Sequence, residues 1–254
     1  MIKAFVFDAY GTLFDPQSVS PSVEAAFPGR GTFITHVWRQ KQLEYTWQRT
    51  SMGAFADFAT VTRDALEYAI RTIAPDPDIA VIEQLCERFN CLDLYPDAAD
   101  ALVRLRQHRL TILSNGSSAM LSALLRHADL QSVFEHVVSS DDVARYKPHP
   151  DIYRAIVARM ELPPSQINLV SSNGFDLAGA KHFGLQTVRI ERVSPTALRD
   201  TVSTTAPITS ETAFLALRSQ MDLFAGQPDF ICASLLDMVQ AVTANASTIN
   251  PENS

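Results

Sequence analysis

The segment Ala4–Phe7 constrains the fold of this chain more than any other, because it is a short apolar run that ends on a carboxylate, Asp8. A glycine turn with a hydroxyl follows at once, in Gly11 and Thr12. Such an uninterrupted run is typical of a strand buried on both faces. We therefore expect Asp8 at the carboxyl end of a first strand, where open α/β sheets keep their ligand crevice. An aspartate in that place can act as a nucleophile.

Three further apolar segments have the same character, and helical segments separate them: Leu110–Leu113, Ile167–Val170 and Thr187–Ile190. This alternation predicts a parallel sheet with right-handed crossovers. A further strand at 229–233 and a closing helix at 235–242 are expected, followed by an irregular tail at 243–254. The predicted fold class is α/β, a doubly wound Rossmann-like parallel sheet.

The interval between the first two predicted strands is roughly a hundred residues, far longer than an ordinary crossover. Apolar side chains recur at helical spacing within it, over 33–45, 66–73 and 79–89. We therefore expect a helical cap subdomain at 16–94, inserted into a core domain formed by 1–15 and 95–254. A second excursion, at 194–227, begins with a predicted N-cap serine and proline. A lid directly after the first strand would close over Asp8 and exclude water.

The charge balance limits the classes of partner. Of the 254 residues, 28 are Asp or Glu and 21 are Lys or Arg, so the net charge is −7. An acidic chain is a poor candidate for nucleic-acid binding, and an anionic substrate would need local positive groups. The three cysteines form no paired framework, which favours free thiols in a reducing cytoplasm. No signal peptide or membrane-spanning run is visible, so we expect a cytoplasmic location and no membrane partner.

Four polar segments, here called stations, follow the predicted strands. We expect the carboxyl ends of these strands to converge on one crevice. The stations are Asp8, Ser114-Asn115-Gly116, Lys147 within a Tyr-Lys-Pro-His-Pro segment, and the segment Ser171–Asp176. Their order and residue types resemble the four motifs of the haloacid dehalogenase superfamily. Phosphatases of that superfamily carry a second aspartate two residues after the nucleophile, as a general acid, whereas this chain has Tyr10. A halide leaving group needs no proton, so Tyr10 favours carbon–halogen bonds.

The chain more specifically resembles the type II (S)-2-haloacid dehalogenases, in the four stations and in the lid segment Val37–Tyr45. The resemblance implies that Asp8 attacks the halogen-bearing carbon and that water then hydrolyses the aspartyl ester, giving an (R)-2-hydroxy acid. It also implies three groups of site residues: catalytic Asp8, Thr12, Arg39, Lys147, Ser171, Asn173 and Asp176; substrate-binding Tyr10, Phe58, Ser114, Asn115 and Tyr153; and halide-binding Arg39, Asn115 and Phe175.

Several of these residues have ordinary structural alternatives. Arg39 could be an arginine snorkelling from an amphipathic helix, Ser114 a helix N-cap, and Asp176 a carboxylate complementing a helix dipole. The resemblance gives Tyr153 a supporting contact with Lys147 or substrate. His149 is interpreted as structural.

The same reasoning predicts no metal and no organic cofactor, because the acidic residue that superfamily phosphatases carry early in the fourth motif is absent from 171–173. The expected partner is a short-chain 2-haloalkanoic acid, and family members are usually homodimers. Two alternatives stay open: a magnesium-dependent phosphatase of the same superfamily and a non-catalytic interaction module.

Overall fold

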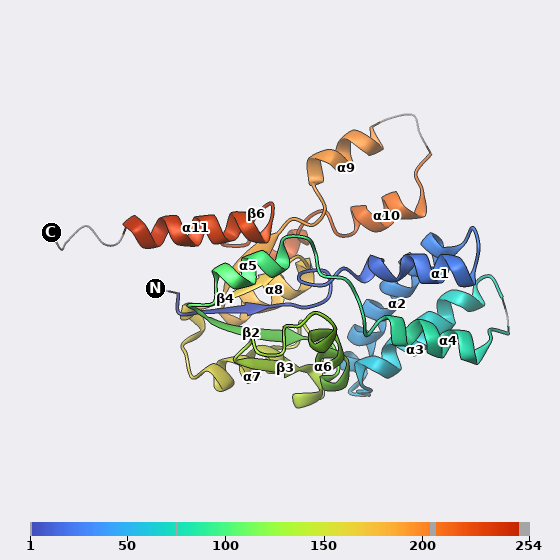
Figure 1. Ribbon diagram of the computed structural model, residues 1–254, viewed down its shortest axis with the longest axis horizontal. Helices are drawn as coiled ribbons and strands as arrows, with labels where there is room; N and C mark the ends of the chain where they lie inside the picture. Colours follow the sequence, from blue (N-terminus) through green and yellow to red (C-terminus); the bar gives the residue numbers. More distant parts are fainter. Residues whose placement is uncertain (1, 75, 204–206, 249–254) are drawn as a thin grey trace.

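The fold is described by a computed structural model covering residues 2–74, 76–203 and 207–248, with side chains to 242. Within these residues it holds a six-stranded parallel sheet in the order β3-β2-β1-β4-β5-β6 (Figure 1). The strands are β1 (Ala4–Phe7), β2 (Arg109–Ser114), β3 (His136–Ser139), β4 (Ile167–Ser171), β5 (Gln186–Ile190) and β6 (Phe230–Cys232). The expected doubly wound sheet is confirmed, and five of these strands lie where the sequence predicted them.

Strand β3 was not predicted, and its burial gives the reason. It is a four-residue edge strand that pairs only with β2. Val137 is 37% exposed, and only Val138 and Ser139 are buried. An edge strand with so little apolar burial lacks the continuous apolar run that identifies the central strands.

Helices cover both faces of the sheet, because alternate strand residues point to opposite sides. Phe5 and Phe7 share a core with α5 (Ala98–Arg104), α6 (Ser118–His127) and α11 (Leu235–Thr248). Ala4 and Val6 instead pack with α7 (Pro150–Met160) and α8 (Gly174–Phe183).

Helix α11 continues past the predicted end at 242, so the expectation of an irregular tail from 243 is wrong up to Thr248. Residues 249–254 lie outside the described part.

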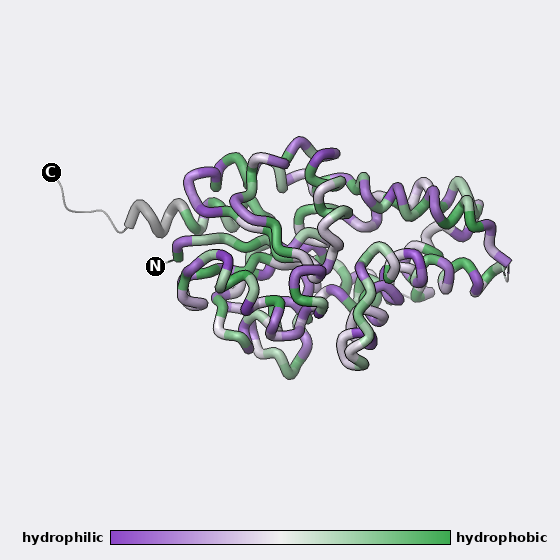
Figure 2. The backbone as a smooth tube through the Cα atoms, turned by 90° about the horizontal axis from the view of Figure 1, so that it is seen from below, coloured by the Kyte–Doolittle hydropathy of each residue, from purple (hydrophilic) through white to green (hydrophobic). Residues whose placement is uncertain are grey.

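The predicted helical insertion follows β1. A short 3-10 turn (Pro16–Val19) leads into α1 (Ser20–Ala26), α2 (Gly31–Met52), α3 (Phe58–Arg71) and α4 (Ile79–Arg88). These four helices form a body beside the carboxyl edge of the sheet (Figures 1 and 2). Its apolar core is continuous with that of the sheet, because the Tyr10 ring lies 5.3 Å from Phe58 and 5.5 Å from Phe89, centroid to centroid. The cap therefore packs directly on the loop that carries the nucleophile candidate.

The second excursion consists of α9 (Pro195–Val202), α10 (Ser210–Ala216) and a 3-10 turn (Leu223–Ala225). Ser194 caps α9 as expected, accepting a hydrogen bond from Ala197 N. Helix α10 packs against α2, so this excursion reaches the cap as well as the core (Figure 1). No helix among the described residues is both long and apolar enough to cross a membrane.

Candidate active site

Asp8 lies at the carboxyl edge of the sheet because β1 is a central strand that ends at Phe7. Phe7 is in register with Ile112 on one side and with Val170 on the other. The strand ends that carry Ser114 and Ser171 therefore reach the same edge. Asp8 is only 5% exposed, and its backbone N–H donates to the Val170 carbonyl at 3.0 Å.

One carboxylate oxygen of Asp8 is held by a set of donors. Oδ2 accepts from Thr12 Oγ1 at 2.9 Å, from Asn173 Nδ2 at 2.7 Å and, more weakly, from Ser171 Oγ at 3.4 Å. Thr12 is itself fixed, because its hydroxyl accepts from Ser172 N at 2.9 Å. The carboxylate is thus oriented from behind by residues of the first and fourth motifs.

The other oxygen of Asp8 faces a buried lysine. Lys147 Nζ lies 3.0 Å from Asp8 Oδ1 and 2.7 Å from Asp176 Oδ2. Burial raises the pKa of Asp176 to about 6, although Lys147 opposes that shift. Burial alone would lower the pKa of Lys147, but the two carboxylates more than offset it and raise that pKa. One ammonium group therefore neutralises two carboxylates.

Tyr153 lies elsewhere than expected. Its hydroxyl donates to Asp176, with Oδ1 and the backbone carbonyl oxygen each 3.0 Å away, and its side chain is fully buried. Its hydroxyl therefore bonds the carboxylate that is paired with Lys147, and Tyr153 does not line the cavity described below. Its role in binding substrate stays a prediction.

The helix-cap alternative for Ser114 is wrong, because Ser117 caps α6 and accepts from Met120 N. Ser114 Oγ instead accepts from Gly116 N at 3.1 Å. The structural interpretation of His149 is supported, since its ring accepts from Asp151 N at the start of α7.

A small cavity of about 10 Å³ adjoins Asp8, with room for about one water molecule. Its lining brings together nine of the thirteen predicted site residues, with Leu43 in addition: Asp8, Tyr10, Arg39, Leu43, Phe58, Ser114, Asn115, Lys147, Asn173 and Phe175. Thr12, Ser171 and Asp176 lie behind this lining, bonded to Asp8 or Lys147. The cap and the core therefore build one site between them.

Arg39 is the cationic side chain that the cap contributes. It is 4% exposed, and its Nη1 donates to Gln42 Oε1 at 2.6 Å. Gln42 in turn donates to Thr62 Oγ1 on α3 at 2.7 Å. The Nε of Arg39 has no hydrogen-bond partner in the described residues, so this guanidinium keeps a donor available. Gln42 and Leu43 lie in the lid segment Val37–Tyr45. The resemblance of this segment to the family was the signal that could have identified them.

Tyr10 is buried, and its hydroxyl has no partner among the described residues. Burial raises the pKa of Tyr10, so the phenol stays neutral at ordinary pH.

A group of three or more His, Cys, Asp or Glu suited to a metal is not found in the part of the chain that the structure describes. The two carboxylates of the site, Asp8 and Asp176, are both paired with Lys147.

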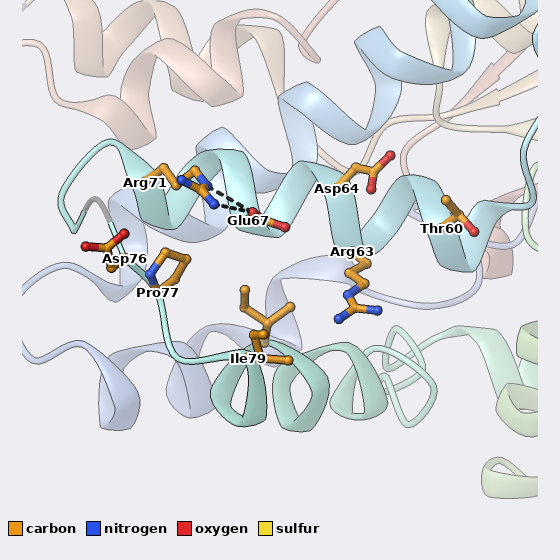
Figure 3. A pocket seen from close by; sticks show the side chains of 9 residues that line it. Thr60, Arg63, Asp64, Glu67, Arg71, Asp76, Pro77 and Ile79 are labelled. Carbon is orange, nitrogen blue, oxygen red and sulfur yellow. Dashed lines mark hydrogen bonds and ion pairs between the residues drawn. The ribbon is translucent and has the colours of Figure 1, made fainter.

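A larger cavity, of about 460 Å³, opens between α3 and α4 (Figure 3). Its lining is mostly charged, and Arg71 forms an ion pair with Glu67 at 2.8 Å. It shares no lining residue with the cavity beside Asp8. A buried nucleophile with a charged partner is present only in the smaller of these two cavities, which we therefore take as the active-site candidate.

Comparison with known proteins agrees with this geometry. The profile of the haloacid dehalogenase-like hydrolases matches residues 2–184. The chain belongs to this family. Over 248 residues it is 47% identical to an (S)-2-haloacid dehalogenase of Xanthobacter autotrophicus, and the match covers 97% of each chain. An (S)-2-haloacid dehalogenase of Pseudomonas sp. (strain YL) is 42% identical over 193 residues, covering 75% of this chain and 83% of that protein.

Solved structures extend the likeness to three dimensions. The L-2-haloacid dehalogenase of Xanthobacter autotrophicus superposes with a TM-score of 0.90 at 46% identity, covering 96% of this chain and 99% of that one. A second structure of that enzyme, with the same TM-score, contains chloropropionic acid bound covalently. The haloacid dehalogenase fold expected from the motifs is therefore confirmed.

Proposed function

We propose that this protein is an (S)-2-haloacid dehalogenase, which hydrolyses short-chain (S)-2-haloacids to (R)-2-hydroxy acids and halide through an ester on Asp8. The observation that carries the proposal is the set of hydrogen bonds and the ion pair made by the Asp8 carboxylate. Three donors hold one carboxylate oxygen, and Lys147 neutralises the other. Tyr10 occupies the position at which superfamily phosphatases carry their aspartate general acid. The 47% identity to an (S)-2-haloacid dehalogenase over 97% of the chain supports the same conclusion.

In the first step, Asp8 Oδ1 attacks C2 of the substrate from the side opposite the halogen. The C2–halogen bond breaks with its electron pair, and halide departs without needing a proton. Arg39, Asn115 and Phe175 line the cavity and form the proposed halide cradle. Lys147 and the N–H groups after Ser114 receive the substrate carboxylate, while Phe58 and Tyr10 enclose its carbon chain.

In the second step, water attacks the carbonyl carbon of Asp8, and the oxygen that becomes negative is Oδ2. Thr12, Asn173 and Ser171 already donate to that oxygen, so they form a preorganised oxyanion site. Asp176 accepts a proton from the attacking water, and Tyr153 and Lys147 hold it in position. As the acyl–oxygen bond breaks, Asp176 returns this proton to the departing oxygen, which becomes the hydroxyl group of the product, and the acid re-formed on Asp8 releases its own proton to solvent. The only inversion at C2 is therefore that of the first step.

The proposed reaction requires neither a metal nor an organic cofactor. The substrate carries one negative charge and releases halide, for which Arg39 and Lys147 supply the compensating charge. A phosphoryl group would need more, usually a magnesium ion held by carboxylates.

Release of chloride from (S)- and (R)-2-chloropropanoate, measured separately with EDTA present throughout, tests this function. We expect release from the (S) isomer alone. Release from neither isomer, together with magnesium-dependent hydrolysis of p-nitrophenyl phosphate, would overturn the proposal in favour of a phosphatase. An Asp8→Ala variant that keeps its biological role would favour the interaction module instead.

The cap subdomain is assigned to 16–94 and the core to 1–15 and 95–254, with the excursion 194–227 belonging to the core. We place the protein in the cytoplasm, because its three cysteines, Cys86, Cys91 and Cys232, are free thiols. A homodimer is proposed as the assembly.

A further inference from the structure

Arg192 lies just after β5, outside the four stations, and its guanidinium contacts the loop that follows Asp8. Its Nη2 donates to the Thr12 carbonyl oxygen at 2.7 Å, and its Nε donates to the same oxygen at 3.3 Å. The described residues give this oxygen no backbone donor, so Arg192 satisfies an acceptor that would otherwise be buried without a partner. The Arg192 side chain is only 9% exposed, which limits the access of water to this contact.

A carboxylate and an aromatic ring hold the guanidinium in place. Asp97 Oδ1 accepts from Arg192 Nη1 at 2.8 Å, and Asp97 Oδ2 accepts from Leu235 N, at the start of α11, also at 2.8 Å. Arg192 Cζ lies 4.0 Å from the ring centroid of Tyr95, whose backbone N–H donates to the Leu13 carbonyl at 2.8 Å. The starts of α5 and α11 and the end of β5 are thereby tied to the loop that follows Asp8.

Through Thr12, these contacts continue to the reacting carboxylate. The Thr12 hydroxyl donates to Asp8 Oδ2 at 2.9 Å, and this is the oxygen that becomes negative when water attacks the proposed ester. Such a donor stabilises the transition state only if it is held in position, and a displacement of about 1 Å can cost about a hundredfold in rate. Arg192 holds the backbone of the residue that carries this donor.

We propose that Arg192 is a positioning residue for ester hydrolysis, which fixes the Thr12 backbone so that the Thr12 hydroxyl points at Asp8 Oδ2. The inference rests on the proposed function. Ester formation depends less on Arg192, because Asp8 attacks through Oδ1, which Lys147 holds, and Oδ2 loses negative charge in that step. A role confined to one of the two steps separates positioning from a general contribution to stability.

Rapid-quench measurements on Arg192→Met test this with enzyme in excess over (S)-2-chloropropanoate. Chloride release reports ester formation, and the intact-protein mass reports decay of the ester. We expect ester hydrolysis to slow about ten- to thirtyfold and ester formation to change less than about threefold. Arg109→Met is the matched control, because Arg109 also contacts a carboxylate, of Glu135, and a backbone carbonyl, of Met160, but at the start of β2. It should leave both rates unchanged.

Thr12→Val removes the donor that Arg192 positions, so the two substitutions should not be additive. T12V should slow ester hydrolysis about a hundredfold, and adding R192M to it should slow this step less than about twofold further. Arg192→Lys keeps the charge but loses the planar fork of donors, so its rate of ester hydrolysis should lie between those of R192M and wild type.

Equal slowing of both steps in R192M, or an effect of R192M that is as large in T12V as in wild type, would overturn the inference. If R192M does not fold, R192K replaces it, and ester hydrolysis at the wild-type rate in R192K would overturn the inference as well. If wild type itself forms no ester, the proposed function fails first, so the two failures remain distinct.

Discussion

At the scale of single residues, we expect protonation of Asp176 to cause the loss of activity at low pH. Burial raises its pKa to about 6, so below that pH Asp176 gains a proton and can no longer accept one from water. Attack by Asp8 does not use Asp176, so ester formation should persist while ester hydrolysis slows. We expect steady-state turnover to fall as pH drops through about 6 and the ester to accumulate, as measured by intact-protein mass after rapid quenching at about pH 5 and about pH 8.

The matched variant for this prediction is Asp176→Asn, which lacks the base at every pH. It should accumulate the ester at both pH values and release about one halide per active site before stopping. Equal ester levels in the wild type at low and high pH would contradict the role given to Asp176.

The motifs were sufficient to predict which residues surround Asp8, because carboxyl ends of parallel strands meet at one edge. The motifs were not sufficient to predict hydrogen-bond partners that depend on how distant segments of the chain pack together. Tyr153 was assigned to Lys147 or substrate, but α7 and α8 pack so that its hydroxyl meets Asp176. Arg218, which follows α10, belongs to no motif, and its guanidinium lies 2.5 Å from the position of an added Cβ at Gly11 because the excursion folds back over the core.

At the scale of elements, the strong apolar strands and the capped helices follow from the sequence, whereas the edge strand β3 does not. Ser194 caps α9, and Asp57 caps α3 by accepting from Thr60 N at 2.8 Å. Such caps depend on local contacts, so they can be read from neighbouring residues. Strand β3 depends on pairing with β2, a contact that its own four residues do not specify.

The excursion also leaves apolar side chains on the surface, which supports the proposal that it contributes to a homodimer interface. Leu223 is 96% exposed and Phe224 is 87% exposed. Because exposed apolar clusters favour association, we expect wild type to sediment as a dimer and Leu223→Asp to shift it towards monomer. Met52→Asp, at an exposed position on the cap, is the control and should leave the dimer intact. A monomeric wild type at working concentration would refute the homodimer.

At the scale of the whole molecule, the long interval after β1 predicted the inserted cap, and the βαβ alternation predicted the sheet. The sequence did not predict that α10 would pack on α2 and bring the excursion against the cap. The cavity beside Asp8, of about 10 Å³, is lined by residues of the cap and the core and is too small for the substrate. Access for substrate therefore requires some movement of side chains or of the cap.

The central claim, an ester on Asp8 hydrolysed at its own carbonyl carbon, is tested most directly by one turnover in water enriched in heavy oxygen. With enzyme in excess over (S)-2-chloropropanoate, we expect the label in the peptide that contains Asp8 and an unlabelled hydroxyl group in the product. Label in the product hydroxyl after a single turnover, with an unlabelled Asp8 peptide, would mean that water attacks C2 directly, and would contradict the account.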